Sequence, residues 1–398
     1  MSIDRKSTAS LSQVYRMTGY TPVASSLSGT GEGASVRCVQ DERVAQKSHV
    51  AVAEPPAAGL RTVLRALRPL VGSRAIDAAG SAPPLERFAM GGDPPAVAQC
   101  TMLEPIRPLR VTMDVGPGVA AFLDGVQRSR VIGHVAGSPI VFATVAAVVR
   151  ERVDRRMSTW GLPRERHIVL AARAHLGEAS WEALEATGVD PVDVTEAQSR
   201  ARGDGLPLHP LAVRARALDL VAQERETLER RLAAEWCQLE SRWLWIDGGI
   251  SGNLAVDASS PAFGVVKSHS TLYGDADALR ATMALALGER GPLFLVRHKA
   301  RRAIASWYLR MHASDDGDPL HGLVRVEVAP PSSLFRPDDT SYVHPDALAV
   351  AALSARADEI SGWIVAERAP ISLPDPRWDT LTYGIYACEQ FLKAFIGS

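Results

Sequence analysis

Two segments of the chain share one pattern, an apolar run that leads into Asp-Gly. The first is AAFLDG, with Asp124, and the second is RWLWIDGG, with Asp247. A carboxylate at the end of a buried strand, followed by a glycine that lets the backbone turn and a ligand approach, presents an acidic catalytic group in many α/β proteins. Asp-Gly is also a common turn dipeptide, so a purely structural turn is the alternative at each place.

A third acid is predicted on the long helix that precedes the second Asp-Gly. The segment QERETLERRLAAEW carries four glutamates, Glu224, Glu226, Glu229 and Glu235. Most of them are expected to form solvated pairs with arginines one helical turn away. Glu229 lies beside the apolar stripe of Leu228 and Leu232, so it is the glutamate best placed to point inward.

The elements that must position these acids alternate between strands and helices. Strand-like runs occur in LRVTMDV, VAAFLDG, HVAGSPIVFATVAAVVRER, RWLWIDGG, AFGVVKSH, GPLFLVRH and LVRVEVA. Helical periodicity marks residues 210–240, ALRATMALALGER, PDALAVAALSARADEISGWIV and TLTYGIYACEQFLKAFI. This alternation predicts an α/β fold over residues 108–398. Residues 1–107 are expected to form a flexible arm with one amphipathic helix at 59–72. This helix could dock on the body of the protein or on a partner, or take part in dimerisation.

Composition and missing motifs exclude several classes of function. The formal net charge is -1, from 44 Lys and Arg against 45 Asp and Glu, so a nucleic-acid partner requires a local basic patch. The four scattered cysteines form no CxxC pair, and no Walker A, GxGxxG, HExxH or GxSxG motif occurs. The N-terminus resembles no secretion signal, and no apolar run is long enough to cross a membrane, so a cytoplasmic protein is expected.

In the order of its motifs the chain resembles the NurA nucleases, the partners of HerA-type hexameric ATPases. The resemblance rests on FLDG at Asp124, LERR at Glu229, WIDGG at Asp247, FGVVKSH at Lys267, SWYLRMH at 306–312 and LVRVEV at 323–328. It runs from about residue 108 to the end of the chain. No single motif is specific, but the ordered set is fairly so.

The resemblance implies a ribonuclease-H-like core, with helical insertions and the N-terminal arm, that hydrolyses DNA phosphodiesters. It implies a divalent cation, with manganese preferred and magnesium as the alternative, and a homodimer that assembles on an ATPase ring. Asp124, Asp247 and Glu229 are then the expected metal ligands, and Lys267 is expected to contact phosphate or to orient water. Carboxylates suit this role because hard cations prefer oxygen ligands.

The closing helix departs from the family pattern, which has a Tyr followed by a His. Here TYGIYACEQFLKAF has no His; Glu389 falls near its position, and Tyr383 or Tyr386 near the tyrosine. Two interpretations stay open, that Glu389 replaces the histidine as a ligand or that the site is degenerate.

DNA contacts are predicted on the basic segment RHKARRAIASWYLRMH. The basic side chains are expected to contact the phosphate backbone of the DNA, and the aromatic side chains are expected to stack on a base. The expected DNA-binding residues are Arg297, Lys299, Arg301, Arg302, Trp307, Tyr308 and Arg310. The alternative is that the aromatic residues belong to the core and the arginine side chains face solvent.

The sequence thus predicts a metal-dependent deoxyribonuclease that acts with a HerA-like ATPase in DNA end processing or defence against foreign DNA. The alternative is a non-catalytic adaptor with the same fold that docks on an ATPase ring. The polarity of cleavage and the choice between single and double strands are not predicted.

Overall fold

The computed structural model describes residues 59–71, 95–112, 118–154, 156–195, 209–297, 302–313, 319–336, 339–343, 346–368 and 383–397. The chain divides into two compact units, Met1–Val50 and Ala51–Ser398, and every described residue belongs to the second. The architecture is mixed α/β, as the sequence predicts.

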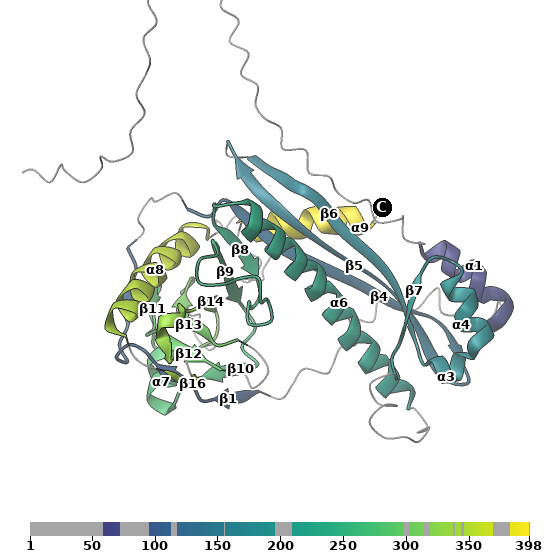
Figure 1. The fold of residues 1–398 in the computed structure, drawn as a ribbon, viewed down its shortest axis with the longest axis horizontal. Helices are drawn as coiled ribbons and strands as arrows, with labels where there is room; N and C mark the ends of the chain where they lie inside the picture. Colours follow the sequence, from purple (N-terminus) through teal and green to yellow (C-terminus); the bar gives the residue numbers. More distant parts are fainter. Residues whose placement is uncertain are drawn as a thin grey trace, which may run out of the picture. The chain divides into compact units, whose positions relative to one another are not determined.

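A large mixed sheet organises the second unit (Figure 1). Its strands in spatial order are β2 (Thr101–Met102), β12 (Phe294–Val296), β13 (Ile304–Arg310), β14 (Leu323–Val328), β9 (Ala262–Val266), β8 (Leu244–Asp247), β4 (Ala121–Val135), β5 (Ser138–Val153), β6 (Arg156–Ala171) and β7 (Asp190–Asp193). The short strands β3 (Leu109–Arg110) and β11 (Glu289–Arg290) extend it beside β13. Two small sheets pair β1 (Ala96–Ala98) with β10 (Thr271–Tyr273) and β15 (Phe335–Arg336) with β16 (Asp339–Val343).

The centre of the sheet combines both strand directions. β4, β5 and β6 form an antiparallel meander. β8 pairs parallel to β4, and β9 pairs parallel to β8. The chain continues from β6 through α3 (Arg173–Leu176), α4 (Glu178–Glu185) and β7, and the helix α6 then connects β7 to β8. The chain thus crosses the sheet on a helix before it returns as a parallel strand, as a parallel connection requires.

The helix α6 (Pro210–Leu239) covers one face of this centre. Pro210 lies in the first turn, where its missing N–H costs nothing, and the side chain of His209 accepts a hydrogen bond from the N–H of Leu211 at the N-cap. The apolar stripe of the helix, with Leu228 and Trp236 fully buried or nearly so, packs against odd-numbered residues of β4 and β5.

Two further helices cover the opposite face. They are α8 (Ala347–Ala366) and α9 (Tyr383–Gly397). Their side chains share one core with Phe122, Trp245 and Phe263, which lie on alternate positions of β4, β8 and β9. A methyl group on Gly384 would overlap the ring of Phe122, so α9 packs tightly on the start of β4.

Three short helices lie at the far end of the long strands: α1 (Leu60–Val71), α3 (Arg173–Leu176) and α4 (Glu178–Glu185). Val63 and Leu67 of α1 are fully buried against Ile132, Ile140 and other residues of a separate core. The amphipathic helix predicted at 59–72 is therefore present, and it packs on the protein's own sheet.

Residue 107 is not a boundary between an arm and the folded domain, because the described residues before it pack into the fold. β1 pairs with β10, and β2 pairs with β12 of the large sheet. The carboxylate of Glu104 forms an ion pair with the buried Arg290 at 2.7 Å. Residues 95–107 hence belong to the folded body, because they supply two edge strands and one partner of this ion pair.

The strand predictions hold in most places but differ around the first Asp-Gly. Asp124 and Gly125 lie inside β4, which continues to Val135, so this Asp-Gly is not a turn. β6, which the sequence analysis did not predict, pairs along β5. Its mixture of Arg, Glu and His hid the strand, since these residues break a simple apolar alternation.

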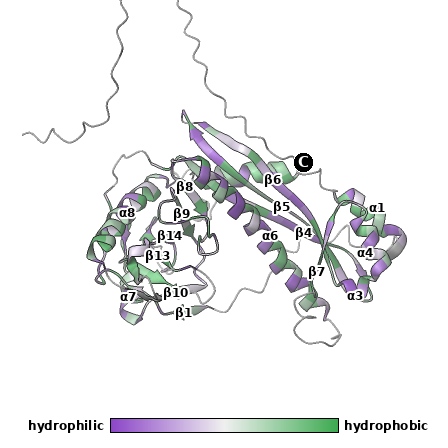
Figure 2. Cartoon of the chain, in the orientation of Figure 1, coloured by the Kyte–Doolittle hydropathy of each residue, from purple (hydrophilic) through white to green (hydrophobic). Residues whose placement is uncertain are grey.

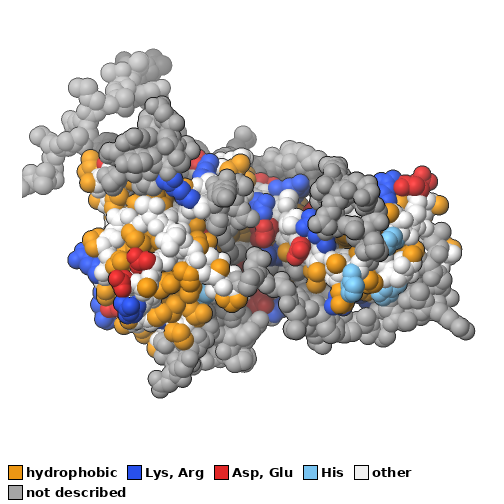
Figure 3. Space-filling model, turned by 90° about the horizontal axis from the view of Figure 1, so that it is seen from below, with side chains coloured by type: hydrophobic (Ala, Val, Ile, Leu, Met, Phe, Trp, Pro, Cys, Tyr) orange, Lys and Arg blue, Asp and Glu red, His pale blue; other side chains and the backbone are white. Residues whose placement is uncertain are grey.

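The remaining helix, α7 (Ala276–Met283), lies near the β1–β10 pair and is capped by Asp275, whose carboxylate accepts a hydrogen bond from the N–H of Ala278. Hydrophilic and hydrophobic residues both appear along α6 and α8, as expected for helices with one face on the sheet (Figure 2). On the face drawn in Figure 3, basic and acidic side chains are interspersed among hydrophobic ones. Within the described residues, no helix is both long and apolar enough to cross a membrane.

Candidate acidic site

Asp124 and Asp247 lie side by side on adjacent parallel strands. The register pairs Leu123 of β4 with Ile246 of β8, so the next residue on each strand is an aspartate. Both aspartates share the face on which the rings of Phe122 and Trp245 meet, with centroids 5.9 Å apart. The two predicted metal ligands from the Asp-Gly motifs are therefore brought together by strand pairing.

Glu229 reaches the same place from the other face of the sheet. It is 8% exposed on α6, as its position beside the apolar stripe predicts. A methyl group on Gly125 would overlap the Oε1 atom of Glu229. The glycine of the first Asp-Gly motif thus provides the gap through which this carboxylate approaches Asp124, and its role is close packing rather than a turn.

Two of the three acids are held by cationic side chains. The Nζ of Lys267 donates to Oδ2 of Asp247 at 2.8 Å. The guanidinium of Arg225 donates to Oε1 of Glu229 at 2.6 Å and to Oε1 of Gln127 at 3.2 Å. Lys267, which follows β9, is therefore in the site, and the sequence analysis missed Arg225 as its second cation.

Burial and mutual repulsion shift the proton affinities of these acids. Desolvation, followed by the charge of Asp247, raises the pKa of Asp124 well above its usual value, although Lys267 opposes this. Desolvation raises the pKa of Glu229 to about 7, even though Arg225 forms an ion pair with it and lowers the value. Arg225 compensates the burial of Glu229 incompletely, because its own side chain is partly exposed.

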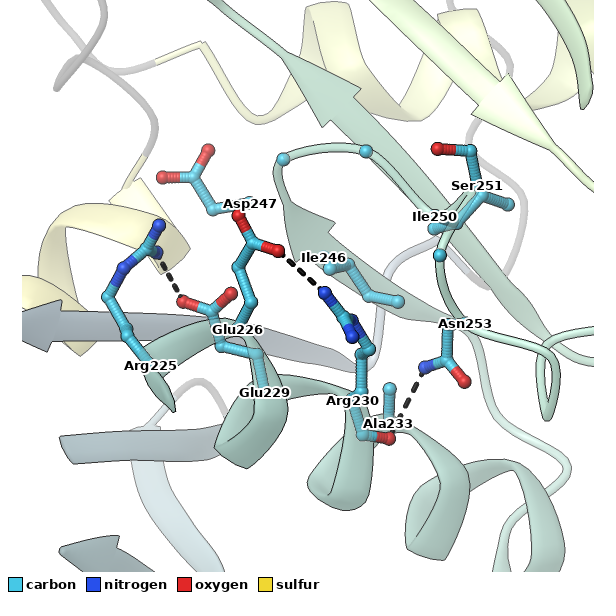
Figure 4. A pocket seen from close by; sticks show the side chains of 13 residues that line it. Arg225, Glu226, Glu229, Arg230, Ala233, Ile246, Asp247, Ile250, Ser251 and Asn253 are labelled. Atoms are coloured by element: carbon cyan, nitrogen blue, oxygen red, sulfur yellow. Dashed lines mark hydrogen bonds and ion pairs between the residues drawn. The ribbon is translucent and has the colours of Figure 1, made fainter. Parts of the chain in front are cut away.

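A cavity of about 180 Å³ opens beside the acids, between α6 and the loop after β8. Figure 4 shows Glu226, Glu229 and Asp247 gathered on one side of it, with Arg225 and Arg230 alongside. Such a mixture of carboxylates and guanidinium groups suits a ligand that carries negative charge together with a cation.

The remaining glutamates of α6 have structural partners. Glu226 pairs with Arg230 at 2.6 Å, one turn along, as predicted. Glu224 pairs with Arg166 and Glu235 with Arg164, so they join the helix to β6.

Glu327 supports the loop that follows Asp247, a role the sequence analysis missed. Its Oε2 accepts a hydrogen bond from the N–H of Ile250 at 2.8 Å, and its Oε1 accepts one from Arg325 at 2.5 Å. Gly248 has φ +119, a conformation that favours glycine, and it turns the chain directly after Asp247. The signal was present in LVRVEV, where Arg and Glu two residues apart must lie on one face of a strand.

The aromatic residues of the predicted DNA-binding segment are buried, so that prediction is wrong for them. Trp307 is fully buried on β13, and its Nε1 donates to Oγ of Ser361 on α8 at 2.8 Å. Tyr308 is 2% exposed, and its hydroxyl accepts a hydrogen bond from the N–H of Tyr273. The alternative interpretation, that these aromatic side chains belong to the core, is correct.

Arg310 is also misassigned, because its guanidinium is fully buried. It donates to the carbonyl oxygens of Leu285, Pro319, His321 and Met283. Arg302 is exposed but donates to the carbonyl oxygens of Val256 and Leu254, and Arg297 is exposed after β12. Lys299 and Arg301 lie outside the described residues.

Glu389 lies on α9, the helix that packs over the start of β4. Its carboxylate forms an ion pair with Lys393 at 2.6 Å, one turn along the helix. Its neighbour Cys388 donates to the carbonyl oxygen of Phe122, two residues before Asp124. The helix is thus placed beside the acids, while a ligand role for Glu389 stays a prediction. The side chain of Tyr383 lies outside the described part, and Tyr386 is partly buried.

The carboxylate oxygens suit a hard cation, but two of the three carboxylates already form ion pairs with basic side chains. Among the described residues, no group of three or more His, Cys, Asp or Glu side chains is gathered closely enough to hold a metal ion. Lys267 bridges to Asp247, and Arg225 holds Glu229. A divalent cation shared by these acids would therefore require both basic side chains to move aside.

No family model matches the sequence, and no curated protein matches it with statistical significance.

Proposed function

We propose that the chain is a metal-dependent deoxyribonuclease of the NurA type. The observation that carries the proposal is the pairing of two aspartates on adjacent parallel strands, with a third, buried carboxylate from α6. Burying carboxylates that repel one another destabilises a fold unless a cation or a ligand compensates. The cost is understandable where the acids bind a cation and a phosphate.

The strand order supports the ribonuclease-H-like part of the proposal. In such a core, three consecutive antiparallel strands are followed, after a helix, by two strands parallel to the first. Here β4, β5 and β6 are antiparallel, and β8 and β9 run parallel to β4 in the order β6-β5-β4-β8-β9. Between β6 and the helix α6 the chain adds α3, α4 and the edge strand β7. The acids lie on β4, on β8 and on the helix α6. Fold alone does not give function, so the site has to carry the argument.

Asp124, Asp247 and Glu229 are the residues that would hold the divalent cation, manganese rather than magnesium. When bound, such a cation neutralises phosphate charge and lowers the pKa of a water molecule. Lys267, released from Asp247, has the charge and reach to bind a phosphate oxygen. Arg225 and Arg230 at the cavity mouth are suited to hold the same phosphate chain. Glu327 would keep the loop after Asp247 in place.

Partners of the chain follow from the same resemblance. We propose a homodimer that receives DNA from a HerA-like hexameric ATPase, in DNA end processing or in defence against foreign DNA. The net charge of -1 supports delivery by a partner, since a weakly charged enzyme has little long-range attraction for DNA. The proposed compartment is the cytoplasm.

The deciding experiment is a cleavage assay with manganese on linear and circular DNA, with and without the ATPase. Asp124→Asn and Asp247→Asn should each abolish cleavage, because an amide binds a hard cation far less well than a carboxylate of nearly the same shape. Asp277→Asn is the matched control, since Asp277 is exposed on α7 and pairs only locally with Arg280. If both site variants cleave DNA at the wild-type rate, the assignment of Asp124 and Asp247 as metal ligands is wrong.

The second candidate is an adaptor that docks on an ATPase ring without catalysis. The closed ion pairs Lys267–Asp247 and Arg225–Glu229 favour it, because they leave the acids neutralised without a metal. An adaptor would bind the ATPase but leave DNA intact at every manganese concentration.

A further inference from the structure

β4 carries two arginines beyond Asp124, on the same face of the strand. Alternate residues of a strand share a face, so Asp124, Arg128 and Arg130 point to the side that α9 covers at the start of β4. The register places Arg128 opposite Thr144 and Arg130 opposite Phe142 on β5. With a rise of about 3.3 Å per residue, the two arginines lie roughly 13 and 20 Å along the strand from Asp124. We call Arg128 and Arg130 the arginine strip.

The charge of the arginine strip is not neutralised by the described part of the chain. Among the described residues, neither guanidinium forms an ion pair with a carboxylate. Desolvation and the neighbouring charge of Arg128 lower the pKa of Arg130, which shows that the two cations repel one another. On that face of β6, the nearest acid along the register is Glu165, whose Oε1 lies 3.8 Å from Nε2 of His167.

The opposite face of the same sheet is organised differently. Arg164 and Arg166 of β6 are also two residues apart, but they point to α6, where they pair with Glu235 and Glu224. Fold stability therefore accounts for that arginine pair. It does not account for two like charges placed together on the other face, because their repulsion opposes folding.

The arginine strip lies between two helices that cover the ends of β4. α9 packs on Phe122, and α1 packs on Ile132. Figure 1 shows α9 and α1 at separate places along the long strands. Arg128 is exposed in the interval. The arginine strip thus lies on β4 between the acidic site and α1, on a chain whose net charge is -1.

We propose that the arginine strip binds the phosphate backbone of a DNA strand and leads it to Asp124. The proposal rests on the nuclease function and names the path of its substrate. Guanidinium groups bind phosphate through two parallel hydrogen bonds, which makes arginine well suited to this contact. A path of about 20 Å matches roughly six phosphates of one strand at an axial spacing of about 3.4 Å.

The test measures DNA binding without metal, so that cleavage does not interfere. Full-length protein is titrated against fluorescein-labelled single-stranded and duplex oligonucleotides at several salt concentrations, and anisotropy gives the binding constant. Loss of two phosphate contacts in Arg128→Gln/Arg130→Gln should reduce the slope of log K against log salt by about 1.4 for single strands and about 1.8 for duplex DNA. Arg128→Lys/Arg130→Lys should retain most of the slope, because the charges remain.

The matched control is Arg164→Gln/Arg166→Gln, which removes the same charge from the same sheet on the opposite face. It should bind DNA with the wild-type slope. An equal loss in both double variants would overturn the proposal in favour of a net-charge effect, and an unchanged slope in Arg128→Gln/Arg130→Gln would overturn it directly. Loss of binding to an acidic segment of the ATPase, with DNA binding intact, would assign the strip to a protein partner instead. Thermal denaturation of each variant shows whether it is folded.

Failure of the nuclease assignment gives a different result. If the wild-type protein never cleaves DNA with manganese, the nuclease assignment is wrong. If the slope of log K against log salt still falls in Arg128→Gln/Arg130→Gln, the role of the arginine strip in DNA binding holds independently. Asp124→Asn should bind DNA at least as well as the wild type, since it removes a negative charge at the end of the path.

Discussion

Replacing Glu229 by glutamine should make the metal-free protein more stable at neutral and alkaline pH. The carboxylate of Glu229 is 8% exposed, and desolvation raises its pKa to about 7 from the ordinary 4.5. Between these two values the folded protein holds a proton that the unfolded chain has released. Stability must then fall as pH rises through this window, because the folded state binds more protons than the unfolded state.

The size of the effect follows from the same two values. At about 1.36 kcal/mol per pKa unit, the interval from 4.5 to about 7 corresponds to roughly 3 kcal/mol, fully present above pH 7 and absent below pH 4.5. Glu229→Gln removes this penalty, and the favourable effect of Arg225 is already contained in the pKa of about 7. The variant should therefore be more stable than the wild type by roughly 3 kcal/mol at pH 8 and about equally stable at pH 4.5.

Urea denaturation in the presence of EDTA, at several pH values from 4.5 to 8, measures this difference. Glu226→Gln is the control on the same helix, since Glu226 is only partly buried and pairs with Arg230, and its effect should not depend on pH in that way. A stability difference between Glu229→Gln and wild type that stays constant across the range would refute the reasoning. Release of repulsion on Asp124 adds in the same direction, so it cannot hide the effect.

Other variants test the packing of the site and the boundary of the fold. Gly125→Ala should displace Glu229, which should slow cleavage and lower the free energy of unfolding by about 1–3 kcal/mol. If the overlap with Glu229 is the cause, Gly125→Ala/Glu229→Ala should regain stability, as a double-mutant cycle measured by urea denaturation would show. Glu389→Gln should leave the metal-free melting temperature no lower and shrink the manganese-induced rise if Glu389 is a ligand; an unchanged rise excludes it. Glu104→Gln should lower stability by about 1–2 kcal/mol, because it weakens an ion pair with the buried Arg290, and an unchanged denaturation midpoint would show that residues before 108 are dispensable to the fold.

The acids of the site were predictable because each has a local signature. Asp124 and Asp247 follow apolar strands, and Glu229 borders an apolar stripe. Their convergence was an inference from motif order, and it is the parallel register of β4 and β8 that produces it. The basic partner Arg225 was hidden, since an arginine one turn from a glutamate looks like any solvated helix pair.

The prediction of the DNA-binding segment failed for Trp307, Tyr308 and Arg310 because the sequence does not show whether an arginine side chain is exposed or buried. Arg310 alternates with aromatic residues on a strand, which is also the pattern of a nucleic-acid surface. In the structure β13 is interior to the sheet, with Trp307 against α8 and Tyr308 against β10, so both faces are covered. Carbonyl oxygens from two loops satisfy Arg310, and no local pattern announces such an arrangement.

The nuclease and adaptor hypotheses make opposite demands on the buried acids. A docking surface has no need of charge at Asp124, where desolvation and the charge of Asp247 both disfavour the ionised form. An adaptor would gain stability from Asp124→Asn and lose nothing, whereas a nuclease would gain stability without metal and lose both cleavage and its stabilisation by manganese. The two measurements on one variant therefore separate the hypotheses even though the metal-free stability rises in both. The ion pair between Lys267 and Asp247 is compatible with both hypotheses, because an ammonium group beside the clustered carboxylates lowers the cost of burying them.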